Sequence, residues 1–176
     1  MERTQEATKN KRPRPSVNPA ETQSEYSSVV LQVDRISRTV KGGRRIRFRT
    51  LVIIGNKNGR VGMGVAKANE VATAVAKATT DAKKNMVNIA LVNGTIPHEI
   101  TIKMDRAKII MKPAKEGTSI IAGSAVRTVA ELAGIRDLNA KVIGSATKIN
   151  IARTTLTCLS SLRVREKGNH DKTKLA

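Results

Sequence analysis

Residues 37–68 read SRTVKGGRRIRFRTLVIIGNKNGRVGMGVAKA, and this stretch decides how the first part of the chain folds. Lys41–Arg44 places two glycines in a basic turn. After the turn, Ile46 and Phe48 alternate with arginines. Strand side chains point to opposite faces with a period of two, so we expect the apolar pair in a core and the guanidinium groups on the other face. The three arginines are Arg45, Arg47 and Arg49.

The flanking segments extend this sheet. Alternation over Val29–Val33 predicts a strand before the basic turn, and the apolar run Leu51–Ile54 predicts a buried strand after it. An Asn-Gly pair at Asn58 and Gly59 is a strong hairpin signal. Apolar residues alternate with glycines over Val61–Val65, which predicts a third strand.

A helix is predicted after the third strand. Its apolar residues recur at spacings of three and four, which is the helical period, and Asn69 is the expected N-cap. Lys77 and Lys84 lie two turns apart on another face of this helix. The first unit therefore has the order β-β-β-α. The apolar stripe consists of Val71, Val75, Ala78, Ala82 and Met86.

The second half predicts a β-β-α-β-α unit. Alternation indicates a strand at Ile100–Met104, and short apolar runs indicate strands at Lys108–Met111 and Lys141–Ile143. The first helix is expected to end at Gly134, and Asn150 is the expected N-cap of the second. The two helical stripes are Ala122, Ala125, Val126, Val129 and Leu132, and then Ala152, Leu156, Leu159 and Leu162.

The composition indicates a nucleic-acid partner. The 176 residues include 33 Lys and Arg against 14 Asp and Glu, a formal net charge of +19. Such an excess repels itself unless a polyanion is near. Aromatic residues make up 1% of the chain, so we expect contacts through phosphates, sugars and shape rather than base stacking. The sequence contains no apolar run of about 18 residues, the length needed to span a membrane, so no membrane partner is expected.

The sequence lacks the residues needed for a disulfide or a metal site. Cys158 is the single cysteine, which rules out an internal disulfide and fits a reducing compartment. His98 and His170 are the two histidines, and they have no metal-ligand spacing with Cys158. We therefore predict no metal, no cofactor and no catalytic site, and we expect no homo-oligomer.

Composition and periodicity divide the chain into four parts. We expect a disordered basic arm at residues 1–25, a first domain at 26–92, a second domain at 93–162 and a basic tail at 163–176. Nothing repeats internally.

Three motifs carry a resemblance to a known family. They are SRTVKGGRR, GNKNGRVGMGVAKA and EGTSIIAGSAVRTVAELAGI, in this order. From about Val29 to about Leu162, the sequence resembles the small ribosomal subunit protein five family of the bacterial or organellar type. The resemblance implies an α+β fold, with a double-stranded-RNA-binding-like β-β-β-α domain followed by a β-β-α-β-α domain. It also implies a left-handed βαβ crossover, whereas ordinary crossovers are right-handed.

Two segments are candidate RNA contacts, and the lysines of the predicted helix are further candidates. The basic hairpin supplies most of the cations, and its glycines let backbone amides approach phosphates closely. The second segment is 56–67, whose glycines have an alternative reading as places where a helix packs closely. It lacks the spacing of a dinucleotide or phosphate-binding loop. The candidate RNA-binding residues are Arg38, Lys41, Gly42, Gly43, Arg44, Arg45, Arg47, Arg49, Lys57, Arg60, Lys67, Lys77 and Lys84.

The resemblance also implies protein partners. It places an interface with small-subunit protein four in the segment from Gly117 to Arg127, names protein eight as a second neighbour, and puts protein three beside the mRNA entry path. The expected interface residues are Gly117, Thr118, Ser119, Gly123 and Arg127. The hairpin would lie near the decoding region of small-subunit rRNA, close to an aminocyclitol antibiotic site.

The function expected is structural, in small-subunit assembly, the mRNA path and accurate decoding. A free regulatory RNA-binding module is the alternative. A kinase-like use of Gly123 and Ser124 ranks last, because no metal-holding carboxylate motif accompanies them. We expect a ribosome in the cytoplasm, and the sequence does not distinguish a bacterial from an organellar origin.

Overall fold

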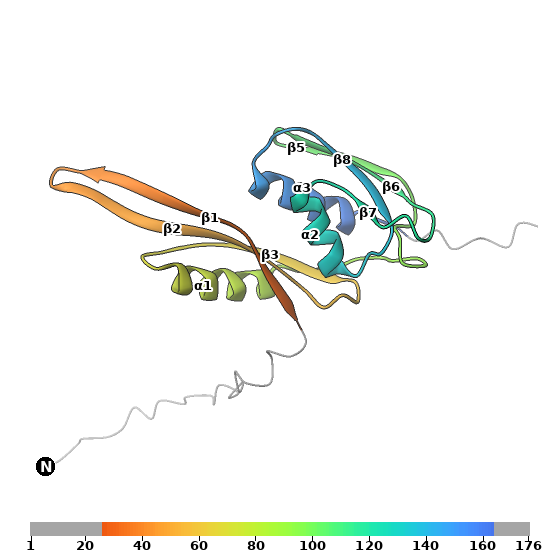
Figure 1. The fold of residues 1–176 in the computed structure, drawn as a ribbon, viewed down its shortest axis with the longest axis horizontal. Coiled ribbons are helices and arrows are strands. Elements are labelled where there is room, and N and C mark those ends of the chain that lie inside the picture. Colours follow the sequence, from red (N-terminus) through yellow and green to blue (C-terminus); the bar gives the residue numbers. More distant parts are fainter. Residues whose placement is uncertain (1–25, 164–176) are drawn as a thin grey trace, which may run out of the picture.

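The computed structural model describes residues 26–163 and consists of stacked layers. Helix α1 covers one face of a first sheet, helices α2 and α3 lie between this sheet and a second one, and the second sheet forms the outermost layer (Figure 1). The predicted arm at 1–25 lies outside the described residues, as does nearly all of the predicted tail at 163–176. The α+β fold class is confirmed.

The first sheet is antiparallel with the order β1-β2-β3-β4. Its strands are β1 (Ser27–Val40), β2 (Gly43–Gly55), β3 (Arg60–Ala68) and β4 (Met86–Asn88). Helix α1 (Val71–Lys84) joins β3 to β4. Strand β4 was not predicted, because three residues are too short to show a period.

The second sheet has the order β5-β6-β8-β7. Its strands are β5 (Ile100–Met104), β6 (Ala107–Pro113), β7 (Ile120–Ile121) and β8 (Leu138–Gly144). Helix α2 (Ser124–Ala133) joins the parallel neighbours β7 and β8, so this is the βαβ unit of the chain. Helix α3 (Lys148–Ser160) follows β8. Strand β7 has two residues and was not predicted.

One hydrophobic core is shared by the two halves of the chain. Leu51 and Ile53 of β2 lie in the same buried cluster as Val129 of α2, Leu159 of α3 and Met111 of β6. A smaller cluster on the other face of the first sheet packs against α1. Consecutive residues of β2 therefore enter different cores, which is why the run Leu51–Ile54 is apolar without alternation.

The glycines of β3 serve helix packing. A Cβ at Gly64 would overlap the carbonyl oxygen of Ala78, and one at Gly62 would overlap that of Ala82. The stripe of α1 is shifted from the prediction, because Ala74 is buried with Ala78 and Ala82 while Val71 is exposed. Small residues on both sides let the helix backbone approach the strand closely. Met86, the last residue of the predicted stripe, lies in β4.

One prediction about β2 was wrong. Ile46 does not enter a core and is 40% exposed, because β3 pairs with β2 only as far as the Phe48–Ala68 partners. The strand predicted over Val29–Val33 is present within β1, although a register shift at Leu31 interrupts its alternation. An extra residue in one strand moves the following side chains to the other face.

The two predicted N-caps were also wrong. Glu70, not Asn69, holds the extended backbone before α1, and it makes no side-chain capping bond. Thr147 precedes α3, and Asn150 lies within its first turn, where its carbonyl oxygen accepts a hydrogen bond from Thr154. By contrast, the prediction that α2 ends at Gly134 is confirmed, because Gly134 has the left-handed φ of 89°.

Candidate nucleic-acid interface

Strands β1 and β2 project beyond the sheet as a two-stranded ribbon (Figure 1). Past the Phe48–Ala68 pair, β2 has β1 as its only described neighbour. The pairing continues without a break from Ile36–Arg47 to Val40–Gly43, at the tip. The ribbon therefore presents both faces to solvent.

Cations collect on one face of the ribbon. Directly paired residues of antiparallel strands share a face, and Arg38 pairs with Arg45 while Asp34 pairs with Arg49. Arg47 lies between these pairs on the same face, by strand alternation. We call this set the arginine face: Arg38, Arg45, Arg47 and Arg49. The predicted alternation of Arg45, Arg47 and Arg49 is thus present, and β1 adds Arg38.

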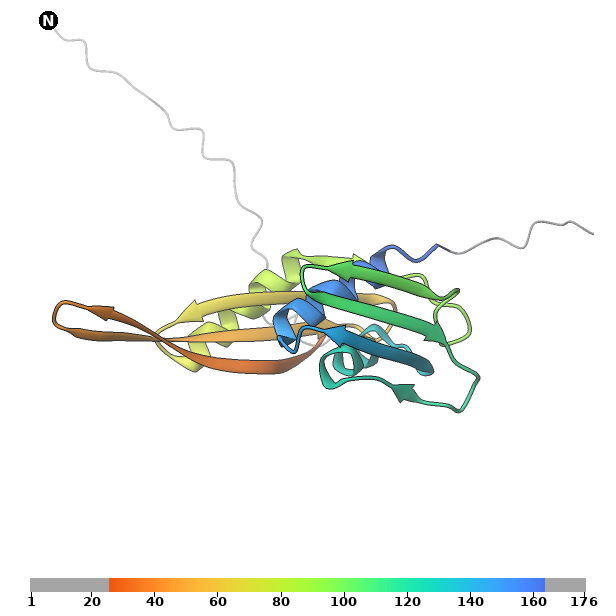
Figure 2. The ribbon, with the colours of Figure 1, turned by 90° about the horizontal axis from the view of Figure 1, so that it is seen from above.

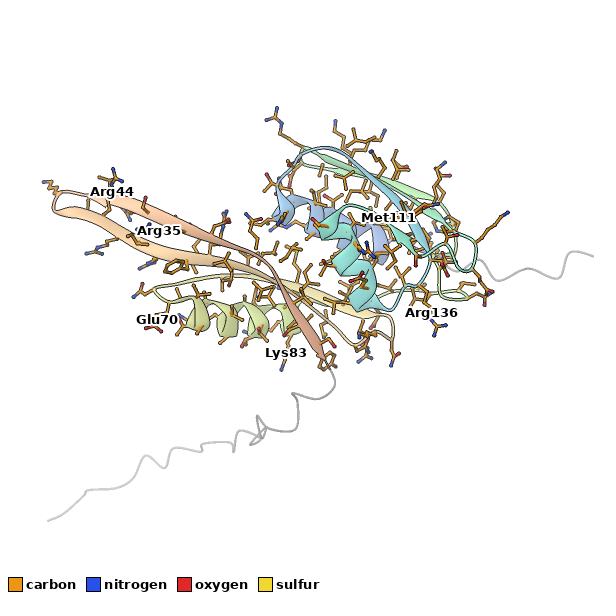
Figure 3. All side chains as sticks on the ribbon, viewed as in Figure 1. Arg35, Arg44, Glu70, Lys83, Met111 and Arg136 are labelled. Atoms are coloured by element: carbon orange, nitrogen blue, oxygen red, sulfur yellow. The ribbon has the colours of Figure 1, made fainter. Side chains whose placement is uncertain are left out.

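The other face has a different chemistry. It carries Arg35 and Arg44, both labelled in Figure 3, together with Ile46 and the half-buried Phe48. At the tip, a Cβ at Gly42 would meet nothing within 4 Å. The turn amides are therefore accessible to a ligand from outside.

Arg49 is the one member of the arginine face with a described ion-pair partner. Its guanidinium donates to Asp34 Oδ2 through Nε at 3.1 Å and Nη2 at 2.6 Å. These hydrogen bonds, and then the one from Gln32, hold the pKa of Asp34 below its ordinary value of 3.8. Among residues 26–163, no carboxylate forms an ion pair with Arg38, Arg45 or Arg47, so their charge is available to a phosphate.

The remaining predicted cations lie in three places. Lys67 pairs directly with Arg49 across β2 and β3, so it extends the arginine face. Lys57 and Arg60 flank the β2–β3 turn at the opposite end of the sheet. Lys77 and Lys84 are exposed on α1, which covers the opposite side of the sheet from α2 and α3. The structure thus brings Lys67 to the hairpin cations and leaves the other four apart.

Two cations near the hairpin were missed. Arg35 stands on the second face of the ribbon, and Lys148 at the start of α3 lies 3.5 Å from the carbonyl oxygen of Leu31. Lys148 also helps to lower the pKa of Asp34. Strand pairing could have suggested Arg35, whereas no sequence signal connects Lys148 with β1, 117 residues away.

The predicted protein-contact residues lie along β7 and its two flanks. Gly117, Ser119, Gly123 and Arg127 are exposed, and Thr118 is partly so. The loop has a defined shape, because the buried Asp137 accepts a 2.7 Å hydrogen bond from the Ser119 amide. Arg127 is paired with Glu131 one helical turn later.

Other features of the described residues concern metal binding, thiol reactivity and membrane insertion. Among residues 26–163, no three His, Cys, Asp or Glu side chains gather so as to hold a metal ion. Burial raises the pKa of Cys158 to about 11, so its thiol stays protonated at neutral pH. Of the helices described, none has the length and apolarity to cross a membrane.

Comparison with known proteins shows the family of the chain. The family model described as ribosomal protein S5, N-terminal domain, matches residues 26–90, and the model of the C-terminal domain matches residues 102–171. The small ribosomal subunit protein uS5 of Thermotoga neapolitana is 45% identical over 138 residues, which are 78% of this chain and 78% of that protein. The chain therefore belongs to the uS5 family of small ribosomal subunit proteins.

Proposed function

We propose that this chain binds small-subunit rRNA through the arginine face, and that it orients the rest of the protein on the subunit in this way. Membership of the family supports a structural role in the small ribosomal subunit. The observation that carries the finer assignment is the ribbon itself. Three guanidinium groups without described ion pairs stand on one face of a hairpin that no other described element covers.

Physical chemistry favours a phosphate partner for this face. Arg38 and Arg45 are direct cross-strand partners, and like charges in this position destabilise a ribbon. A phosphate backbone offsets that repulsion and releases its condensed counterions on binding. Phosphate contacts mainly set position and register, which is the task of a structural protein.

The wider role follows the expectations drawn from the family resemblance. We propose that the protein contributes to subunit assembly, the mRNA entry path and decoding accuracy, in the cytoplasm. The exposed residues Gly117, Ser119, Gly123 and Arg127 support a contact with small-subunit protein four, with proteins eight and three as further neighbours. We propose no enzymatic activity and no cofactor.

The test is a footprint on rRNA in reconstituted small subunits. We compare R45Q/R47Q with K115Q/R136Q, which removes the same charge from exposed positions outside the hairpin. The hairpin variant should lose protection of one rRNA segment. The magnitude of its negative slope of log Kobs against log salt should decrease by about 1.4–1.8, because two phosphate contacts are lost. The control should keep the protection.

Two outcomes would contradict the proposal. Equal effects of the two variants would mean that net charge, and not the position of the arginines, determines rRNA binding, as in a free RNA-binding module. Failure of the wild-type chain to sediment with small subunits at high salt would point to the same alternative.

A further inference from the structure

The outer face of the second sheet is uncovered. The inner face packs against α2 and α3, and the outer face has no described element over it (Figures 1 and 2). Alternation and register assign the outer side chains of three adjacent strands. They are Thr101 and Lys103 of β5, Lys108, Ile110 and Lys112 of β6, and Asn139, Lys141 and Ile143 of β8. Side chains that end in nitrogen rise from this side of the sheet in Figure 3.

Four lysines on this surface lie next to one another, and we call them the lysine face: Lys103, Lys108, Lys112 and Lys141. Lys103 and Lys108 are direct partners across β5 and β6. Lys141 is the partner of Ile110, so it stands diagonally from both Lys108 and Lys112. Cβ atoms of direct partners lie about 5 Å apart and diagonal neighbours about 7–8 Å apart, which makes a continuous row of ammonium groups.

This row is poorly neutralised within the chain. Lys112 pairs with Glu99 at 3.2 Å, with both side chains more than half exposed. Among residues 26–163, no carboxylate forms an ion pair with Lys103, Lys108 or Lys141. Like charges directly opposite each other destabilise a sheet, so the Lys103–Lys108 pair needs a counter-charge from outside the described chain.

The position of the lysines decides between two classes of partner. Lysine is depleted from the core of protein–protein interfaces and is found at their rims. Here Lys108 and Lys141 occupy the two central strands, β6 and β8. A protein partner would have to bury these ammonium groups, whereas a phosphate backbone neutralises them while they remain hydrated. No aromatic side chain stands on the face to stack a base, which also favours phosphate contacts over base reading.

We infer that the lysine face binds a second segment of RNA through its phosphates, distinct from the segment bound by the hairpin. The inference rests on the proposed function in taking RNA as the ligand. The two cationic surfaces belong to different sheets, and the layer of α2 and α3 lies between those sheets (Figure 1). Two attachment points on one rigid protein make the second contact intramolecular, which raises its effective concentration.

The experiment compares K103Q/K108Q/K141Q with K83Q/K115Q/R136Q, which removes the same charge from exposed positions away from the lysine face. Hydroxyl-radical footprints are recorded on small-subunit rRNA in reconstituted subunits, and binding is titrated against salt. The lysine-face variant should lose one protected segment and keep the segment that depends on Arg45 and Arg47. The magnitude of its slope of log Kobs against log salt should decrease by about 2–3, because each lost phosphate contact reduces that magnitude by about 0.7–0.9. Its Tm should stay the same or rise, since a like-charge pair is removed.

Three results would overturn the inference. The first is a lysine-face variant with the same footprint and salt slope as the control. The second concerns I121S/I143S, which removes two exposed apolar side chains of the outer face; Ile121 of β7 belongs to this face because it pairs with Asn139. Loss of a small-subunit protein from the particle in this variant, with rRNA protection intact in the lysine variant, would make the face a protein interface. The third is a lysine variant that loses both protected segments, which would mean one continuous RNA site. If the hairpin-dependent segment is missing even in wild-type subunits, the proposed function fails rather than this inference alone.

Discussion

The backbone amide of Lys57 donates a hydrogen bond of 3.0 Å to the carbonyl oxygen of Leu132. The amide of Gly59 donates likewise to Ala133, at 2.8 Å. Carbonyl groups in the last turn of a helix lack partners within the helix, so the β2–β3 turn satisfies the end of α2. The backbone of the first half of the chain is thereby bonded to that of the second half, at the end of the sheet opposite the ribbon.

This junction predicts an unusual sensitivity at Gly134. A Cβ there would overlap the carbonyl oxygen of Lys57, and the φ of Gly134 is +89°. Gly134→Ala should therefore destabilise the protein by about 1–2 kcal/mol from the left-handed backbone and by roughly 1–3 kcal/mol from the clash. Gly117→Ala is the matched control, because Gly117 has φ +85° with nothing within 4 Å. Urea unfolding of both variants measures the difference, and equal losses of stability would show that the close approach is unimportant.

Gly64 should matter for the packing of α1. Alanine at this position would overlap the carbonyl oxygen of Ala78, so Gly64→Ala should lower the free energy of unfolding by roughly 1–3 kcal/mol. Gly42→Ala, at the open tip of the ribbon, should change stability by less than about 0.5 kcal/mol. Thermal unfolding followed by circular dichroism tests the pair. A stable Gly64→Ala variant would mean that α1 can shift away from β3 at little cost.

Asp34→Asn should release Arg49 for RNA. Asp34 now accepts two hydrogen bonds from the Arg49 guanidinium, which competes with any phosphate. We expect tighter rRNA binding and a salt slope steeper by about 0.7–0.9. Glu116→Gln is the control, since it removes one negative charge from an exposed loop away from the hairpin. Weaker binding of the Asp34 variant would instead show that Asp34 positions Arg49 on the RNA.

The same ion pair predicts a pH dependence of stability. The pKa of Asp34 is lowered in the folded protein, chiefly by the hydrogen bonds from Arg49. The ionised Asp34 therefore adds to the free energy of unfolding above pH 3.8, its ordinary pKa, and this stabilisation is lost as the pH falls through the folded pKa. Both side chains are partly exposed, so Asp34→Asn should cost less than about 1 kcal/mol at pH 7. The difference in free energy of unfolding between variant and wild type, measured by urea titration, should decrease below pH 3.8. A difference independent of pH would refute this account.

Deletion of the hairpin tip and deletion of residues 1–25 should have different effects. Removing Lys41–Arg44 shortens the ribbon beyond the sheet, so the fold should persist while docking in the decoding region and aminocyclitol sensitivity change. Removing 1–25 takes away several cations and should lower affinity for all RNAs alike. Footprints in reconstituted subunits compare the two. If the arm deletion alone erases the decoding-region protection, the roles are reversed.

Much of the fold could be predicted locally. The buried run Leu51–Ile54, the end of α2 at Gly134 and the α3 stripe of Ala152, Leu156 and Leu159 were all predicted, and the structure confirms them. Leu162, the last residue of the predicted stripe, is buried but lies beyond the end of α3 at Ser160. Each depends on a short-range rule: a strand buried on both faces, a residue that tolerates positive φ, or the helical period. The alternation of Arg45, Arg47 and Arg49 is of the same kind, because strand geometry alone puts them on one face.

Other features depend on where distant segments meet. The end of β3 at Ala68 decides that Ile46 is exposed, and the approach of α3 decides that Lys148 joins the hairpin cations. The register of β6 against β5 and β8 decides that Lys108 lies beside Lys103 and Lys141. Pairing register and layer stacking are set by the burial of the whole core, so the short-range rules for strands and helices carry no information about them. Local sequence patterns therefore define most of the strands and helices and the charge on each, whereas the packing of distant segments selects which charges share a surface.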